Sequence, residues 1–201
     1  DEAFCFYYQD NFDILESLGA ELVFFSPLRN TDLPPDIDGL YLGGGYPELY
    51  ASDLSENTTM LTQIKQWSST NRPLYAECGG FMYLTEGIFD HQKNFWPLAG
   101  IFPVRSHMHN RLAKLGYRTV STSGADCIFG SNKTLQGHEF HYSTIDEMPA
   151  SVNRAFTFDT GVQEGYITNN TLGTYLHQHF GADPGIAENF INFCQRNSLC
   201  Q

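Results

Sequence analysis

The chain has 201 residues, 41% of them hydrophobic and 14% aromatic, which is enough to bury one substantial core. Its formal net charge is −12, from 11 Lys and Arg against 23 Asp and Glu, which argues against a nucleic-acid partner or an anionic membrane surface as partner. No apolar run approaches the roughly 20 residues of a membrane span, and no signal peptide is recognisable at the start. We therefore expect one cytoplasmic domain over residues 1–201 that binds neither nucleic acid nor membrane.

The start of the chain and the cysteines narrow the setting further. The chain does not begin with methionine, and Asp1 leads almost directly into an apolar run, so we expect a segment of a longer polypeptide. Because the number of cysteines is odd and no C-x-x-C pair occurs, neither a disulfide framework nor a zinc site is expected, and we predict reduced thiols and no metal site. The five cysteines are Cys5, Cys78, Cys127, Cys194 and Cys200.

In the first half, short apolar runs alternate with segments of helical periodicity. The apolar runs are Ala3–Tyr8, Glu21–Ser26, Gly39–Leu42 and Arg72–Glu77, the last three of which are predicted strands. The predicted helices are Asp10–Leu18, which Gly19 would end, Thr59–Ser69, and a helix that opens at Gly79. This alternation predicts an α/β fold with a mostly parallel open sheet covered by helices on both faces.

The second half is less regular and is predicted to contain mainly strands. These are Leu98–Val104, Gly116–Ser121, Ala155–Phe158, Gly165–Thr168 and Gly173–Leu176. A helix over Gly185–Asn197 would close the domain. In open α/β sheets, ligands bind at the carboxyl ends of the strands, and both glycine clusters of the chain fall at such ends.

One cysteine stands where a nucleophile is often found. Cys78 directly follows the predicted strand Arg72–Glu77 and precedes Gly79 and Gly80. A strand-to-helix turn this tight strains the central residue and presents its side chain at the top of the sheet, as in the nucleophile elbow. A helix that begins at Gly79 would also favour the thiolate. The alternative is a small buried apolar residue, as most free cysteines are.

A second glycine cluster, Gly43–Glu48 (GGGYPE), follows the preceding strand. Its uncovered backbone N–H groups, those of Gly44 and Gly45, could hold the oxyanion of a tetrahedral intermediate together with the N–H of Gly79. The cluster could also be a flexible turn or a phosphate loop, but no Lys-Ser or Lys-Thr follows the glycines.

A nucleophilic cysteine requires a base, and the chain has seven histidines. Two of them, His177 and His179, come just after an apolar strand and would share one side if that strand continued. A large distance in sequence between cysteine and histidine is usual for such pairs.

Taken together and in order, the motifs resemble those of the class I (triad-type) glutamine amidotransferases, whose sheet is flavodoxin-like. Within them, the chain is most similar to the branch of cobyrinic acid a,c-diamide synthase and cobyric acid synthase. The matching motifs span nearly all of the chain: Asp1–Tyr8, Phe25–Leu28, Gly43–Glu48, Tyr75–Gly80, Met108–Leu112, Leu115–Tyr117, Gly137–His141 and Gly173–His177. The matches outside the catalytic motifs favour the a,c-diamide synthases of this branch.

The resemblance implies a glutaminase domain that uses no cofactor and releases ammonia from glutamine through a thioester on Cys78, with His177 as base. An amino-terminal synthetase domain, missing from this chain, would use ATP and Mg²⁺ to activate carboxylates of a cobyrinic acid-type tetrapyrrole. Arg111, Glu139 and His141 are weaker candidates for glutamine recognition or for docking to that domain.

The chain departs from the class I pattern at one position. His-x-Glu is common in the class, the Glu orienting the His, whereas this chain has His177-Gln178-His179. The departure predicts a Cys–His dyad, with His179 as a secondary candidate, and leaves open which group fixes the tautomer of His177.

Three alternative functions remain open. The same glutaminase could serve another synthetase, such as cobyric acid synthase, a nickel-sirohydrochlorin a,c-diamide synthase or a cell-wall lipid amidotransferase. The chain could also be a cysteine hydrolase of the same architecture, such as a peptidase or a thiol-based chaperone, although Gly43–Glu48 and Gly173–His177 argue against it. The third alternative is a non-catalytic domain that only binds the synthetase.

Overall fold

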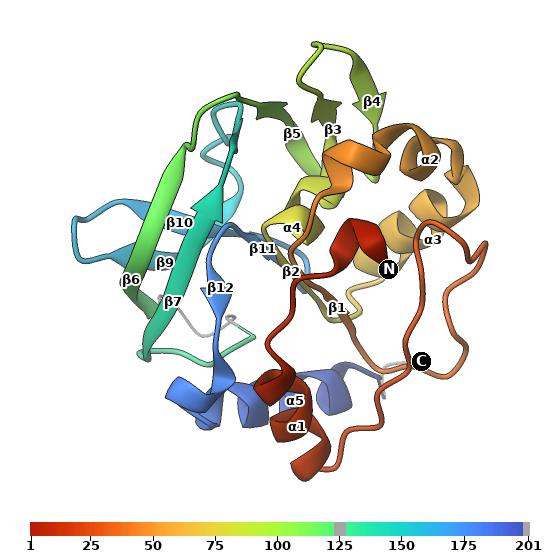
Figure 1. The fold of residues 1–201 in the computed structure, drawn as a ribbon. Helices are drawn as coiled ribbons and strands as arrows, with labels where there is room; N and C mark the ends of the chain where they lie inside the picture. Colours follow the sequence, from red (N-terminus) through yellow and green to blue (C-terminus); the bar gives the residue numbers. More distant parts are fainter. Residues whose placement is uncertain (123–127, 199–201) are drawn as a thin grey trace.

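A computed structural model of the chain describes residues 1–122 and 128–198, so Cys127 and Cys200 lie outside the described residues. Its centre is an eight-stranded sheet in the order β1-β2-β11-β10-β9-β6-β7-β12 (Figure 1). The strands of this sheet are β1 (Leu40–Leu42), β2 (Leu74–Glu77), β6 (Lys114–Thr122), β7 (Thr134–His141), β9 (Asn153–Phe158), β10 (Gln163–Thr168), β11 (Thr171–Thr174) and β12 (His177–Gln178).

A smaller four-stranded sheet lies beside it, in the order β4-β3-β5-β8. Its strands are β3 (Thr85–Phe89), β4 (Phe95–Pro97), β5 (Phe102–Met108) and β8 (Ser143–Ile145). The helical elements are η1 (Glu2–Phe4), α1 (Gln9–Ser17), η2 (Pro47–Tyr50), α2 (Ala51–Glu56), α3 (Thr58–Ser69), α4 (Gly79–Leu84), η3 (Phe180–Ala182) and α5 (Gly185–Ser198). In the part of the chain that the structure describes, no helix is both long and apolar enough to cross a membrane.

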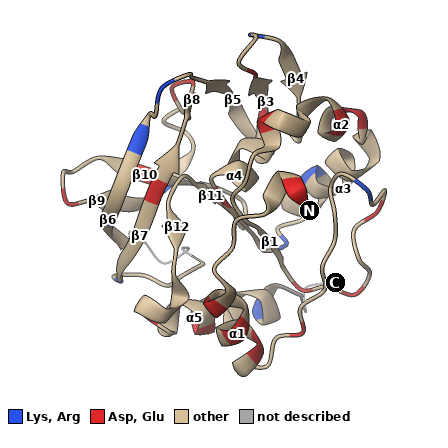
Figure 2. Cartoon of the chain, in the orientation of Figure 1, with Lys and Arg blue, Asp and Glu red and all other residues tan. Residues whose placement is uncertain are grey.

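Helices cover both faces of the central strands, as predicted. The strand β2 is fully buried, and its side chains alternate between two cores, with Leu74 and Ala76 in one and Tyr75 in the other. The first core is covered by α2, α3 and α4, and the second by α1 and α5, which lie together below the sheet in Figure 1. Acidic side chains dominate α1, α2 and the loop before β1, and the few basic ones are dispersed (Figure 2).

The α/β class of the fold is confirmed, but the sheet is mixed. Only the pairs β1–β2 and β2–β11 are parallel, and the remaining pairs of the large sheet are antiparallel. The reason is the short connection between strands in the second half of the chain. Parallel neighbours need a crossover of a dozen or more residues, whereas tight turns join antiparallel ones.

Several predicted elements hold and others do not. The predicted helices over 10–18, 59–69 and 185–197 are confirmed within one or two residues, and Gly19 follows α1 with φ 92°. The predicted strand Glu21–Ser26 is wrong, because these residues join neither sheet. The apolar run Ala3–Tyr8 forms η1 and a loop, in which Phe6 makes a single bridge to Gly44.

In the second half, the predicted strands over 98–104 and 173–176 are shifted relative to β5 and β11. Those over 116–121, 155–158 and 165–168 lie within β6, β9 and β10. Five strands have no sequence prediction: β3, β4, β7, β8 and β12. Of the cysteines, Cys5, Cys78 and Cys194 are free thiols.

Candidate active site

Cys78 occupies a sharp turn between β2 and α4, as predicted. Its backbone has φ 45° and ψ −101°, a region that non-glycine residues rarely adopt, at a cost of about 1–3 kcal/mol. The two following glycines permit the turn. A Cβ atom on Gly80 would lie 2.4 Å from the carbonyl oxygen of Leu42, and one on Gly79 would lie 2.9 Å from the backbone nitrogen of Gly45. The turn therefore brings the cysteine against the glycine loop after β1.

The glycine loop supplies fewer free N–H groups than the sequence suggests. The N–H of Gly44 donates to the carbonyl oxygen of Phe6 at 3.1 Å. The N–H groups of Gly45 and Gly79 donate to no other described residue. Gly45 and Gly79 also approach each other closely, so these two N–H groups lie near one another beside Cys78.

His177 reaches the site from the far edge of the large sheet. It lies on β12, which pairs antiparallel with β7 so that His177 faces His138. The imidazole is buried, packs edge-on against Phe6, and sits so near Gly44 that a Cβ on that glycine would lie 2.4 Å from Cε1. The role of Gly44 in this structure is therefore to leave room for the histidine.

A buried carboxylate stands next to His177, and it comes from the residue before the cysteine. Oε2 of Glu77 lies 3.5 Å from Nδ1 of His177, and both side chains are almost fully buried. Glu77 also accepts hydrogen bonds from the Tyr75 hydroxyl at 2.5 Å and from the Gln178 N–H at 2.9 Å. The Tyr41 hydroxyl donates to it at 3.1 Å. The sequence analysis left open which group fixes the tautomer of His177. The structure places a carboxylate beside the ring, at a position other than the usual His-x-Glu.

The electrostatics of His177 follow from these neighbours. Burial lowers the pKa of its imidazole, but the interactions with Cys78 and Glu77 outweigh burial and raise that pKa to about 10. The nearby His138 has a lowered pKa, because it is partly desolvated and faces the charge of His177. At neutral pH the arrangement favours a positively charged His177 beside the Cys78 side chain.

A cavity of about 480 Å³ opens over these groups. Its walls combine apolar and polar side chains, among them Phe6, Glu48, Met82, Asn110, His138 and Ser143 around Cys78 and His177. Partial burial raises the pKa of Glu48. A cavity of this size suits a small polar molecule such as an amino acid.

The weaker sequence candidates lie in different places. His141 lines the cavity, where it stacks on Tyr175. Glu139 and Arg111 are not among the described residues that line it: Glu139 is bonded to Arg118 at 2.6 Å, and Arg111 is exposed. His179 lies outside the cavity and is paired with Asp10 at 3.2 Å.

Two site residues had no role in the sequence analysis, Glu77 and Glu48. Each stands inside a motif that marked the site, one before the cysteine and one after the glycines. The sequence does contain a signal for Glu77, because it is a charged residue at the end of an otherwise apolar strand. A buried charge requires a partner, so such a residue indicates an interaction inside the protein.

A strained cysteine at a strand-to-helix turn, a buried His–Glu pair and two N–H groups that bond to no other described residue form a site for acyl transfer through a cysteine. Residues 1–185 match the family described as the CobB/CobQ-like glutamine amidotransferase domain, and the chain belongs to this family.

Individual relatives agree with this assignment. The chain is 42% identical to a cobyrinate a,c-diamide synthase of Dehalococcoides mccartyi over 197 residues, which cover 95% of this chain and 42% of that protein. It is also 42% identical to a cobyrinate a,c-diamide synthase of Leptospira interrogans over 204 residues, covering 98% of this chain and 44% of that protein. The chain thus spans less than half the length of these curated relatives. A solved glutamine amidotransferase structure has the same fold, with a TM-score of 0.69 at 14% identity and 93% of each chain covered.

Proposed function

We propose that this chain is the glutaminase part of a cobyrinate a,c-diamide synthase, in which Cys78, His177 and Glu77 release ammonia from glutamine. The observation that carries the proposal is that the turn holding Cys78 lies against the buried His177–Glu77 pair. In this pair Nδ1 of His177 and Oε2 of Glu77 are 3.5 Å apart. The similarity to two a,c-diamide synthases at 42% identity supports the choice of acceptor.

The reaction is an acyl transfer through a thioester. In this proposal the proton of the Cys78 thiol has passed to His177 before the reaction starts, and the sulfur attacks the side-chain amide carbon of glutamine. The N–H groups of Gly45 and Gly79 bind the resulting oxyanion. The imidazolium then gives its proton to the amide nitrogen, the C–N bond breaks, and ammonia leaves.

Hydrolysis completes the cycle. Water loses a proton to His177 and attacks the thioester carbon, which releases glutamate and restores the Cys78 thiol. Glu77 does not touch the substrate; it holds the His177 ring and stabilises its positive charge in both steps, as the carboxylate of a Ser-His-Asp triad does.

The glutamine itself needs partners for its charged end. Glu48 offers a carboxylate on the cavity wall that can bind the α-ammonium group, and Asn110 and Ser143 add neutral polar groups. In this assignment Arg111 and Glu139 take no part in glutamine binding. The exposed Arg111 is left for contacts with the synthetase domain, whereas Glu139 is buried against Arg118.

The ammonia would be consumed by a synthetase domain of the same polypeptide. That domain would bind ATP, Mg²⁺ and a cobyrinic acid-type tetrapyrrole, and it would convert carboxylates of the tetrapyrrole into amides. Because the mechanism requires a reduced thiol at Cys78, we infer that the protein works in the cytoplasm.

Measurement of glutamate release tests both parts of the proposal. The chain is assayed alone and then together with a synthetase domain, ATP, Mg²⁺ and cobyrinic acid. We expect turnover to rise roughly 5–150-fold with all components, the range that a coupling energy of about 1–3 kcal/mol gives. Equal turnover would contradict the coupling, and stimulation only by a different tetrapyrrole would contradict the choice of acceptor. Peptide cleavage without glutamate release would contradict the glutaminase itself.

A further inference from the structure

A buried carboxylate that the mechanism does not use lies beside the segment that leads to His177. Glu164 belongs to β10, which pairs antiparallel with β11, and its side chain is buried. Burial raises the pKa of this carboxyl to about 7, although hydrogen bonds from Thr174 and Tyr175 oppose the shift. A buried carboxylate is costly unless its oxygens are hydrogen-bonded, so the groups that satisfy Glu164 indicate what the residue holds in place.

Glu164 binds the short connection between β11 and β12, the strand that carries His177. Its Oε1 accepts a hydrogen bond from the Tyr175 N–H at 2.8 Å, and its Oε2 accepts one from the Thr174 hydroxyl at 2.5 Å. The Thr174 hydroxyl oxygen in turn accepts from the Leu176 N–H at 2.9 Å. The carboxylate therefore fixes, directly or through one hydroxyl, the three successive residues that end immediately before His177.

The same connection also holds the nucleophile. The Cys78 N–H donates to the carbonyl oxygen of Thr174 at 2.7 Å, so the backbone of the cysteine turn is bonded to the first residue of the connection. Thr174 thus has its carbonyl group bonded to Cys78 and its hydroxyl group bonded to Glu164. Because His177 comes three residues later, its position relative to Cys78 depends on the geometry of this connection.

The action of Glu164 on the reaction is indirect. Neither Glu164 nor Thr174 is among the described residues that line the active-site cavity. On the other side of His177, the Gln178 N–H donates to Glu77 at 2.9 Å. Two buried glutamates therefore hold the chain on either side of the catalytic histidine, and only Glu77 also approaches its ring.

We propose that Glu164 is a positioning residue for glutamine hydrolysis: by holding the connection between β11 and β12, it sets the position of His177 relative to Cys78. The proposal rests on the function proposed above, in which these two residues carry the reaction. The precision required is high, because a misplacement of about 1 Å can lower turnover on the order of 10²-fold. Loss of the Thr174 hydroxyl would leave the Leu176 N–H and one Glu164 oxygen without this partner, and the connection would relax.

The test compares two threonines at opposite ends of β11. Thr174→Val removes the hydroxyl that joins Glu164 to the connection and keeps the shape of the side chain. Thr171→Val is the matched control, because Thr171 is equally buried and its hydroxyl donates to Ser68 at 2.6 Å, at the end of the strand away from Cys78. Both substitutions remove one buried hydrogen-bonding group, so a purely structural role predicts the same result for the two variants.

Glutamate release is measured with the synthetase domain, ATP, Mg²⁺ and cobyrinic acid, and the rate at which iodoacetamide alkylates Cys78 is measured in the chain alone. In Thr174→Val, we expect kcat to fall roughly 10–100-fold with KM for glutamine nearly unchanged, because the reacting groups are misplaced while the cavity keeps its lining. Alkylation of Cys78 should slow as His177 moves away from the sulfur. Thr171→Val should keep kcat and alkylation close to those of the unsubstituted chain, and Thr174→Ser, which retains the hydroxyl, should recover most of kcat.

Glu164→Gln is the second variant, for the case that Thr174→Val does not fold. It preserves the volume and leaves one oxygen for the Tyr175 N–H, but it places a donor opposite the Thr174 hydroxyl, so kcat should again fall with KM unchanged. An unchanged kcat in Glu164→Gln, or equal effects of Thr174→Val and Thr171→Val on kcat and on alkylation, would overturn the proposal. An unsubstituted chain that releases no glutamate would instead contradict the proposed function, and the alkylation rates would still test the position of His177.

Discussion

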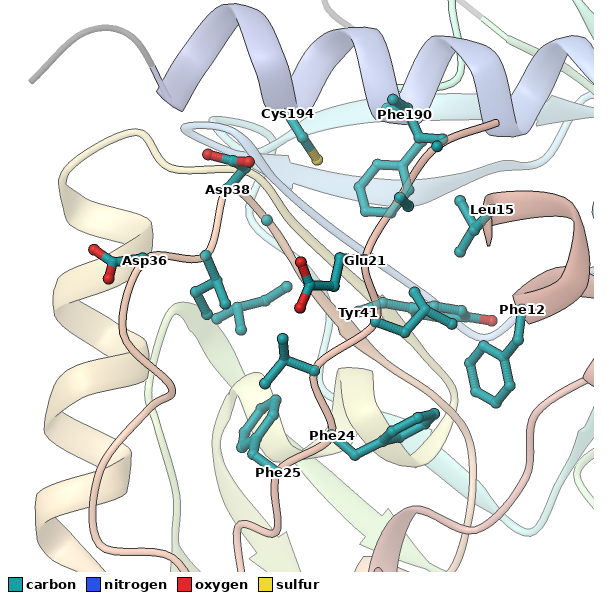
Figure 3. Close-up of a pocket in the computed structure, with 18 of the residues that line it drawn as sticks. Phe12, Leu15, Glu21, Phe24, Phe25, Asp36, Asp38, Tyr41, Phe190 and Cys194 are labelled. Atoms are coloured by element: carbon teal, nitrogen blue, oxygen red, sulfur yellow. The ribbon is translucent and has the colours of Figure 1, made fainter. Parts of the chain in front are cut away.

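Two cavities among the described residues are similar in volume and differ in the groups that line them. The active-site cavity, about 480 Å³, gathers Cys78, His177 and Glu48 at the carboxyl ends of strands. A second cavity, about 550 Å³, lies between β1 and residues 20–25 and combines apolar side chains with the carboxylates of Glu21, Asp36 and Asp38 (Figure 3). Burial raises the pKa of its thiol, Cys194, to about 12. One cysteine is therefore placed beside a cationic histidine, and the other is kept protonated.

The groups that line a cavity therefore indicate its function better than its volume does. Convergent titratable groups and unpaired N–H groups beside a strained nucleophile indicate chemistry. A buried thiol with a raised pKa, such as Cys194, does not. Matched substitutions in the two cavities test this difference.

The largest effect is expected from the two cysteines. Cys78→Ala should reduce glutamine-dependent activity to background, since removal of the nucleophile costs on the order of 10⁶-fold in a comparable acyl-transfer enzyme. Amidation with free ammonia should persist. Cys194→Ala should leave glutamine-dependent turnover unchanged. A glutamine-like alkylating agent, followed by mass spectrometry, should label Cys78 before Cys194, and the reverse order would refute the assignment.

The two histidines of the HQH segment give the next largest contrast. His177→Ala should lower kcat/KM for glutamine roughly 10²-fold or more, because the general base and the thiolate's counter-charge are lost together. His179→Ala should cost much less, because His179 pairs with Asp10 outside the cavity. Steady-state glutaminase kinetics decide the order, and a larger loss at His179 would mean that the base has been misplaced.

A change in pH dependence is expected from Glu77→Gln, which removes the charge beside His177 and keeps the shape. The pKa of His177 is about 10 in the folded protein against 6.5 for an ordinary histidine. Protonated His177 therefore stabilises the fold fully below pH 6.5, and this contribution is lost as pH rises through 10. In Glu77→Gln the alkaline limb of kcat/KM should move to lower pH, and the stability lost between these pH values should shrink. A purely structural role would lower stability equally at every pH and leave the alkaline limb in place.

The smallest effect is expected at the charged end of the substrate. Glu48→Gln should raise KM for glutamine about tenfold with little change in kcat, since a hydrogen bond to a charged group is lost in ground and transition states alike. The matched control is Glu21→Gln in the second cavity, which should leave KM unchanged. An unchanged KM in Glu48→Gln would remove Glu48 from glutamine binding.

The local features of the site could be predicted from the sequence alone. Strain at Cys78 follows from a strand that runs into two glycines, and a turn of this kind is decided within a few residues. The helices over 10–18, 59–69 and 185–197 follow from their apolar periodicity, which their own residues carry. The motifs around them also placed the chain among the glutamine amidotransferases before any geometry was known.

Only the tertiary structure reveals the features that depend on contacts between residues far apart in the sequence. Glu77 lies beside His177 because β2 pairs with β11 and the chain then turns over the end of the sheet. The two residues are 100 positions apart, so no local sequence pattern contains this contact. Residues 21–26 show the converse: their composition is that of a strand, yet a strand forms only where a partner supplies hydrogen bonds. Helices satisfy their own backbone, whereas strands and catalytic pairs must be completed by other parts of the polypeptide.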